Sequence, residues 1–242
     1  MEYEEFVEHV RLDGERLATV AEGDLGTTVP SCPNWTVRDL VAHVAQVYEH
    51  KIECTRLGHA PDPWPPDWPG AEEPVAWYRD ALARLLAMFQ ASDAATPSAT
   101  WWPADQTVGF WARRMAHETA VHRVDAELAR GAETPIDAAL ATDGVDEILR
   151  IMLEGDWSDD ADDAATGQRV AIETGGRMWE VRLDRGAMTV VDGDGSADAG
   201  LSGEPSDVLL WLWGRAGDDR VVVEGDGQAR RVLRERLTMA TQ

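Results

Sequence analysis

The hydrophobic pattern changes type part-way along the chain, and this change constrains the fold more than any other feature. Up to about residue 155, apolar residues recur at intervals of three and four, as in amphipathic helices. From residue 167 onward, segments such as QRVAIETGG and MWEVRLDRG alternate apolar and polar residues between glycine turns, which is typical of strands. We therefore predict the class α + (α+β), with a helical bundle over residues 1–155 and a small α+β domain over residues 167–242.

An acidic segment separates the two patterns. In DWSDDADDAATG, five aspartates fall within eight residues and repel one another, so they cannot pack into a core. We expect residues 156–166 to form an exposed linker.

The helical region is expected to contain four or five helices. The first covers residues 1–22, and the second begins after Thr36, a good N-cap, and ends near Leu57. The fourth runs from about Thr107 to Arg130, and the stretch IDAALATDGVDEILRIMLEG is also helical. The prolines of GHAPDPWPPDWPGAEEP make that segment a loop before the third helix. The residues expected to be buried by the second and third helices are Leu40, Val44, Val47, Tyr78, Leu82, Leu85 and Phe89.

The charge balance narrows the class of partner. The net charge of −23 argues against nucleic acids and anionic membranes, because both are bound by clusters of lysine and arginine. No apolar run approaches the roughly 20 residues of a membrane helix, and the charged N-terminus does not resemble a secretory signal. Cys32 and Cys54 form no disulfide framework. We expect a cytoplasmic protein that is a monomer or a homodimer.

A carboxylate and an imidazole occupy the inward stripe of the fourth helix. Glu118 and His122 follow Trp111 and Met115 at helical spacing, and His43 lies on the apolar face of the second helix. Burying an ionised carboxylate without a partner is costly, and two histidines with one carboxylate suit zinc or non-haem iron.

The alternative interpretation of these residues needs no metal. Glu118 and His122 would bond to each other and to Arg113 or Arg114, and His43 would be a core histidine. Spacing alone favours this alternative, because glutamate and histidine four residues apart are common on helices.

Two segments resemble signatures of the mycothiol-dependent maleylpyruvate isomerase family. These segments are CPNWTVRDLVAHV, residues 32–44, and RRMAHETAVHRVDAE, residues 113–127. The resemblance implies a DinB-like four-helix bundle whose metal ligands are His43, Glu118 and His122. The segments ADAGLSGEPSDVLLWLWGR and DDRVVVEGD are similar to the family's second domain, which implies a sterol-carrier-like α+β fold. One departure is Asn34, where the signature usually has glycine, but asparagine also tolerates positive φ.

The resemblance also implies an activity. It implies a metal-dependent enzyme that activates the thiol of mycothiol for attack on a small electrophile, as an S-transferase or detoxification enzyme. Maleylpyruvate cis–trans isomerisation, metal-dependent hydrolysis and a non-catalytic metal- or ligand-binding module are the alternatives. We expect a divalent metal, preferably zinc because thiolate chemistry needs no redox change, and a low-molecular-weight thiol. Arg215 is a candidate catalytic residue that would hold a substrate carboxylate.

Several further residues have more than one interpretation. Asp125 could fix the tautomer of His122, or bond to Arg123 or face solvent. His50 could reach the mouth of the site, although an exposed position is the expected one. We expect His117 to support the ligands from behind or to lie on the surface, and Cys32 to be a small buried residue rather than a nucleophile. Most tryptophans are expected in the core, but Trp64 and Trp68, in the proline-rich loop, could instead line a pocket above the metal.

Overall fold

Residues 1–64, 73–157, 165–193 and 197–241 are described by a computed structural model of the chain. Two units make up this structure, Met1–Thr134 and Pro135–Gln242. The boundary lies about twenty residues before the expected one, because the helical stretch after residue 135 packs against elements of the second unit. Most of the predicted acidic linker, residues 158–164, lies outside the described residues, as does Trp68 of the proline-rich loop.

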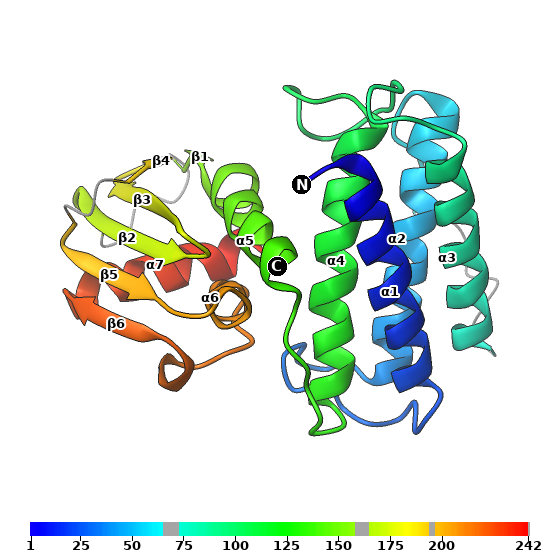
Figure 1. Ribbon diagram of the computed structural model, residues 1–242, viewed down its shortest axis with the longest axis horizontal. Coiled ribbons are helices and arrows are strands. Elements are labelled where there is room, and N and C mark those ends of the chain that lie inside the picture. Colours follow the sequence, from blue (N-terminus) through cyan, green and yellow to red (C-terminus); the bar gives the residue numbers. More distant parts are fainter. Residues whose placement is uncertain (65–72, 158–164, 194–196, 242) are drawn as a thin grey trace. The chain divides into compact units, whose positions relative to one another are not determined.

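The first unit is a four-helix bundle, as predicted (Figure 1). Its helices are α1 (Tyr3–Ala21), α2 (Val37–Leu57), α3 (Pro74–Gln90) and α4 (Val108–Leu128). α1 packs along α4, and α2 packs along both α3 and α4, so α4 is covered from two sides. Among the described residues, no helix is both long enough and apolar enough to cross a bilayer.

Local sequence signals account for the ends and the buried faces of these helices. Thr36 caps α2 as predicted, in a reciprocal box in which its hydroxyl accepts from the Asp39 N–H and the Asp39 carboxylate accepts from the Thr36 N–H. Gly58 ends α2 at a φ of 72°, in the left-handed region. All the expected core residues of α2 and α3 are buried except Val47, which is partly exposed.

The second unit combines a mixed sheet with helices. It begins with α5 (Ala138–Glu147) and a π-helical turn, η1 (Ile148–Leu153). The strands are β1 (Gly155–Asp156), β2 (Gln168–Thr174), β3 (Arg177–Asp184), β4 (Ala187–Asp192), β5 (Ala199–Ser202) and β6 (Val222–Gly225). Two helices, α6 (Pro205–Leu212) and α7 (Gly227–Ala240), and the short 3₁₀ turn η2 (Asp218–Arg220) complete the unit.

The sheet of the second unit has the order β1-β4-β3-β2-β5-β6. β2 to β4 form the expected antiparallel hairpins, whereas β5 pairs in parallel with β2. Side chains alternate between buried and exposed along β3, where Trp179, Val181 and Leu183 enter the core. Hairpins, a parallel central pair and packed helices make this an α+β unit, as the alternating pattern predicted.

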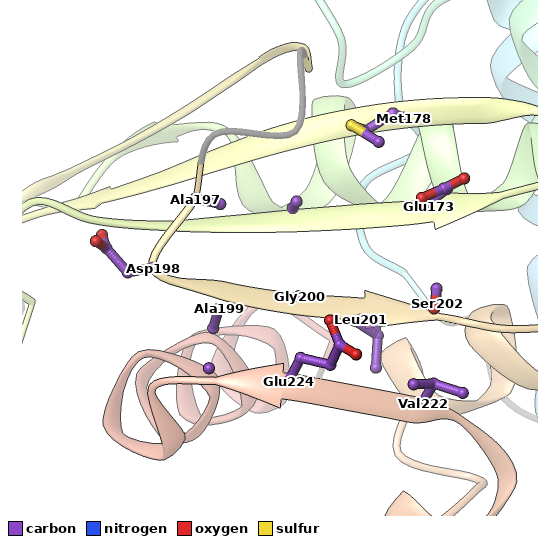
Figure 2. A pocket seen from close by; sticks show the side chains of 12 residues that line it. Glu173, Met178, Ala197, Asp198, Ala199, Gly200, Leu201, Ser202, Val222 and Glu224 are labelled. Carbon is purple, nitrogen blue, oxygen red and sulfur yellow. The ribbon is translucent and has the colours of Figure 1, made fainter.

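A shallow groove of about 300 Å³ crosses β2, β5 and β6 in the second unit (Figure 2). Glu173, Asp198 and Glu224 contribute carboxylates to its lining, and none of its described lining residues is basic. This groove would therefore repel an anionic ligand.

Candidate metal centre

α4 carries buried polar side chains on two of its faces because helices pack on both. The face toward α1 holds Arg123 and Glu127, and the face toward α2 holds Glu118, His122 and Asp125. Sequence periodicity predicted the second set but gave no sign that the first set is also buried.

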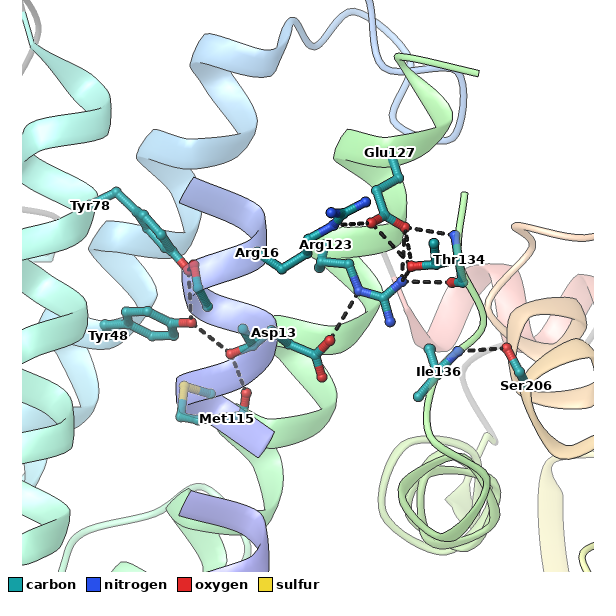
Figure 3. A network of polar contacts seen from close by, with 12 residues as sticks. Asp13, Arg16, Tyr48, Tyr78, Met115, Arg123, Glu127, Thr134, Ile136 and Ser206 are labelled. Atoms are coloured by element: carbon teal, nitrogen blue, oxygen red, sulfur yellow. Dashed lines mark hydrogen bonds and ion pairs between the residues drawn. The ribbon is translucent and has the colours of Figure 1, made fainter. Parts of the chain in front are cut away.

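On the α1 side the charges neutralise one another (Figure 3). The Arg123 guanidinium donates to Asp13 Oδ1 at 3.0 Å, to Glu127 Oε2 at 2.9 Å and to the Thr134 carbonyl at 2.6 Å. Glu127 also accepts from Arg16 at 2.8 Å and from the Thr134 backbone N–H at 2.7 Å. This face is a closed structural network.

On the α2 side three potential metal ligands converge. The carboxylate oxygen Oε1 of Glu118 lies 3.4 Å from His43 Nε2 and 3.3 Å from His122 Nε2. One ligand atom from each residue lies within 4.8 Å of the others. The fold thus brings together His43 from α2 and the Glu118–His122 pair from α4, as the spacing required.

These distances fit a tetrahedral metal. An ion bound at about 2.0–2.1 Å from each ligand holds its ligand atoms about 3.3–3.4 Å apart. The two distances between the Glu118 oxygen and the histidine nitrogens have this value, and two imidazoles with one carboxylate leave a position open. The donor set therefore suits a divalent ion such as zinc.

Neighbouring side chains fix the orientation of the ligands. His122 Nδ1 donates to Asp125 Oδ2 at 2.8 Å, and the fully buried Asp125 also accepts from the Ser31 hydroxyl. Arg114 Nη2 lies 2.7 Å from Glu118 Oε2, which leaves Oε1 facing the histidines. The predicted bond between Asp125 and His122 is therefore present, as is the predicted contact between Arg114 and Glu118.

The contact between His122 and Glu118 needs a positive charge, which a proton or a metal ion could supply. With its proton on Nδ1, His122 would turn an Nε2 lone pair toward the lone pairs of Glu118. The repulsion is removed either by a second proton on the ring or by a metal. Without metal, burial lowers the pKa of His122, but Glu118 and Asp125 outweigh burial and raise it to about 9. Burial likewise raises the pKa of Glu118, but His122, His43 and Arg114 together hold it well below its ordinary value.

The turn that precedes α2 supplies a wall of the site. Asn34 has a φ of 70°, and the Trp35 N–H donates to the Cys32 carbonyl at 3.0 Å, so Cys-Pro-Asn-Trp forms a tight turn with proline and asparagine at its centre. Trp35 then packs on His43 at 4.9 Å and on His122 at 6.4 Å between ring centroids. The sequence indicated the turn, but it did not reveal that Trp35 and Ser31 touch the site.

A pocket of about 230 Å³ opens beside His43. Val47 lines it, which explains why this residue is partly exposed rather than buried as predicted. His50 and Trp64 reach the pocket as well, with their rings 5.0 Å apart, so His50 is not the freely exposed residue expected. The remaining lining residues are Gln46 and Lys51.

Two other sequence predictions need correction. His117 is not on the surface, because it is fully buried and packs on Phe6 of α1, with ring centroids 6.0 Å apart. Cys32 is partly exposed, and its thiol lies 3.6 Å from Asp125 Oδ2. It therefore contributes to the environment of His122 rather than to the core.

Arg215 lies in the second unit, after the end of α6. Its guanidinium donates to the Trp213 carbonyl at 2.7 Å and lies 5.8 Å from the centroid of the Trp213 ring. A role in holding substrate stays a prediction for this residue.

Comparison with known proteins identifies the helical unit. Residues 8–127 match the model of the mycothiol maleylpyruvate isomerase N-terminal domain. The chain belongs to the mycothiol-dependent maleylpyruvate isomerase family. The match includes all three converging residues, His43, Glu118 and His122.

Solved structures share the fold of the whole chain. A crystal structure of the mycothiol-dependent maleylpyruvate isomerase aligns with a TM-score of 0.63 and 16% identity, over 93% of this chain and 95% of the other. A histidine-to-alanine mutant of that isomerase aligns with a TM-score of 0.61 and the same identity and coverage. No curated protein sequence matches the chain. At this identity, the structural alignment establishes the shared two-part fold.

Proposed function

We propose that this protein is a divalent-metal-dependent enzyme that uses mycothiol to modify a small electrophile, most simply as an S-transferase. The observation that carries the proposal is the convergence of His43, Glu118 and His122, with the Glu118 oxygen 3.4 and 3.3 Å from the two histidine nitrogens, within a domain of a mycothiol-dependent family. A metal bound there would act as a Lewis acid that lowers the pKa of a coordinated thiol.

The chain's own residues prepare the site for this chemistry. Asp125 holds the His122 ring so that Nε2 faces the ligand position, and Arg114 directs one oxygen of Glu118 toward the same point. Trp35 covers the two histidines on one side, and the pocket beside His43 leaves room for a ligand on another.

Maleylpyruvate isomerisation is the second candidate, and the family match favours it. The two activities differ in their products. A transferase releases a conjugate that keeps the thiol, whereas an isomerase releases a geometric isomer and regenerates the thiol.

Product analysis with mycothiol and a panel of electrophiles that includes maleylpyruvate tests the proposal. We expect thiol-dependent turnover by the wild type, its loss in His43→Ala and its retention in His59→Ala, a matched variant at an exposed loop histidine. Turnover without thiol would indicate hydrolysis instead. Binding of metal and thiol without any turnover would indicate a non-catalytic module.

A further inference from the structure

Lys51 is the only lysine in a sequence that has 22 lysines and arginines in total. It lies two turns after His43 on α2 and lines the same pocket. A chain that uses arginine at every other basic position thus places its one compact ammonium group beside the candidate metal centre.

The groups that contact the Lys51 ammonium are aromatic rings and a neutral imidazole, and none of them carries a compensating negative charge. Its Nζ lies 4.8 Å from the centroid of the Trp111 ring and 5.7 Å from that of Trp101, and it contacts His50 Nδ1 at 3.2 Å. Within the described parts of the chain, no carboxylate lies within ion-pair distance of this nitrogen. Burial lowers the pKa of Lys51 to about 8, as expected for a cation that has been partly desolvated without a counter-ion.

The groups around Lys51 are compatible with binding of an anion. His50 accepts from the ammonium, and burial together with Lys51 lowers the pKa of His50 to about 4, so this ring is neutral and keeps its proton on Nε2. The charge of Glu118 raises the pKa of Lys51 but does not outweigh burial, and this carboxylate is already engaged by Arg114 at 2.7 Å. The pocket therefore offers one unpaired positive charge, a neutral ring and the Gln46 amide.

We propose that Lys51 binds a carboxylate of the electrophilic substrate in the pocket beside His43. The reactive carbon of the substrate would then lie between the carboxylate on Lys51 and the ligand position of the metal centre. That the bound carboxylate belongs to a substrate rests on the proposed function, but carboxylate binding at Lys51 can be tested without turnover.

The test uses fumarate as the probe, with fumaramide as its uncharged analogue, on protein as purified and after metal removal. Calorimetry should detect fumarate but not fumaramide, and Lys51→Gln should weaken fumarate binding about tenfold or more. Arg56→Gln removes a positive charge from an exposed position on the same helix and should leave the affinity unchanged. The Lys51→Gln affinity for mycothiol should also equal that of the wild type.

The single lysine permits a second readout that needs no variant. Reductive methylation with carbon-13 formaldehyde labels only Lys51 and the N-terminal amine, and the lysine signal should titrate at a higher pH when fumarate is present. An unchanged titration, equal fumarate affinity in wild type and Lys51→Gln, or weakened mycothiol binding in place of fumarate binding would overturn the proposal. Fumarate binding without thiol-dependent turnover would contradict the proposed function alone.

Discussion

Arg123 and Glu118 lie on the same helix, and both carry a largely buried charge, yet their surroundings differ. Arg123 is enclosed by Asp13, Glu127 and the Thr134 carbonyl, so its donors meet acceptors within the bundle. Glu118 has one oxygen on Arg114, while the other lies between the nitrogens of His43 and His122. The first cluster is complete by itself, whereas the second is balanced either by a second proton on His122 or by a bound metal ion.

The difference separates two reasons for burying charge. A closed network fixes the packing of α1 on α4, whereas the open set, Glu118 with His43 and His122, presents donor atoms that a metal ion could bind. Lys51 belongs with the open set, because its positive charge lacks a carboxylate partner among the described residues. Removing the unpaired charge of Lys51 and removing a charge from the closed network should therefore change the free energy of unfolding in opposite directions.

The largest effect is expected from opening the closed network. Arg123→Ala leaves the buried Glu127 and the mostly buried Asp13 without their shared guanidinium, which should lower the free energy of unfolding by about 3–5 kcal/mol. Urea denaturation measures this change. Arg16→Ala removes a half-exposed partner of the same Glu127 and should cost less than about 1 kcal/mol. Equal losses in the two variants would contradict the distinction between them.

Removing the unpaired charge should have the opposite sign. Lys51→Met should raise the free energy of unfolding near pH 7 by on the order of 1–3 kcal/mol, because the folded protein disfavours the ammonium. The penalty is complete below the folded pKa of about 8 and fades as the pH rises toward the unfolded value of 10.5, so wild-type stability should approach that of the variant. Denaturation curves measured across this range test the prediction. A wild type more stable than Lys51→Met near neutral pH would show that the tryptophans satisfy the cation.

A smaller effect should follow from neutralising the residue behind His122. Asp125→Asn preserves the shape of the side chain but removes the charge that orients the His122 ring, so metal affinity should fall about 10–100-fold. Competition with a chromophoric chelator measures it. Asp39→Asn removes a carboxylate from the capping box of α2 and should leave metal affinity intact. Unchanged affinity in Asp125→Asn would mean that the ring is held by packing on Trp35.

The sequence allowed prediction of the features that depend on local spacing. Helical periodicity and the Thr36 capping signal located α1 to α4, and the same periodicity placed His43, Glu118 and His122 on inward faces. The bounds of α1, α2 and α4 accordingly differ from the predictions by no more than two residues.

The features that the sequence did not reveal depend on contacts between distant segments. Periodicity identifies a buried stripe, but α4 is packed on more than one side, so His117 is also buried, against α1. Trp35 reaches the histidines only because of the turn before α2, and Val47 is exposed because a pocket opens there. The stretch after Thr134 has ordinary helical spacing, and its packing partner in the second unit could not be inferred from that spacing.

Metal content tests the central claim most directly. Elemental analysis of the purified wild type should find close to one equivalent of a divalent metal, His59→Ala should keep it, and His43→Ala should lose it while remaining folded. This result would join α2 and α4 in one metal centre. A folded wild type that stays metal-free when supplied with zinc, or a His43→Ala variant that binds metal as tightly as the wild type, would contradict the account and leave Glu118 and His122 as an ion pair.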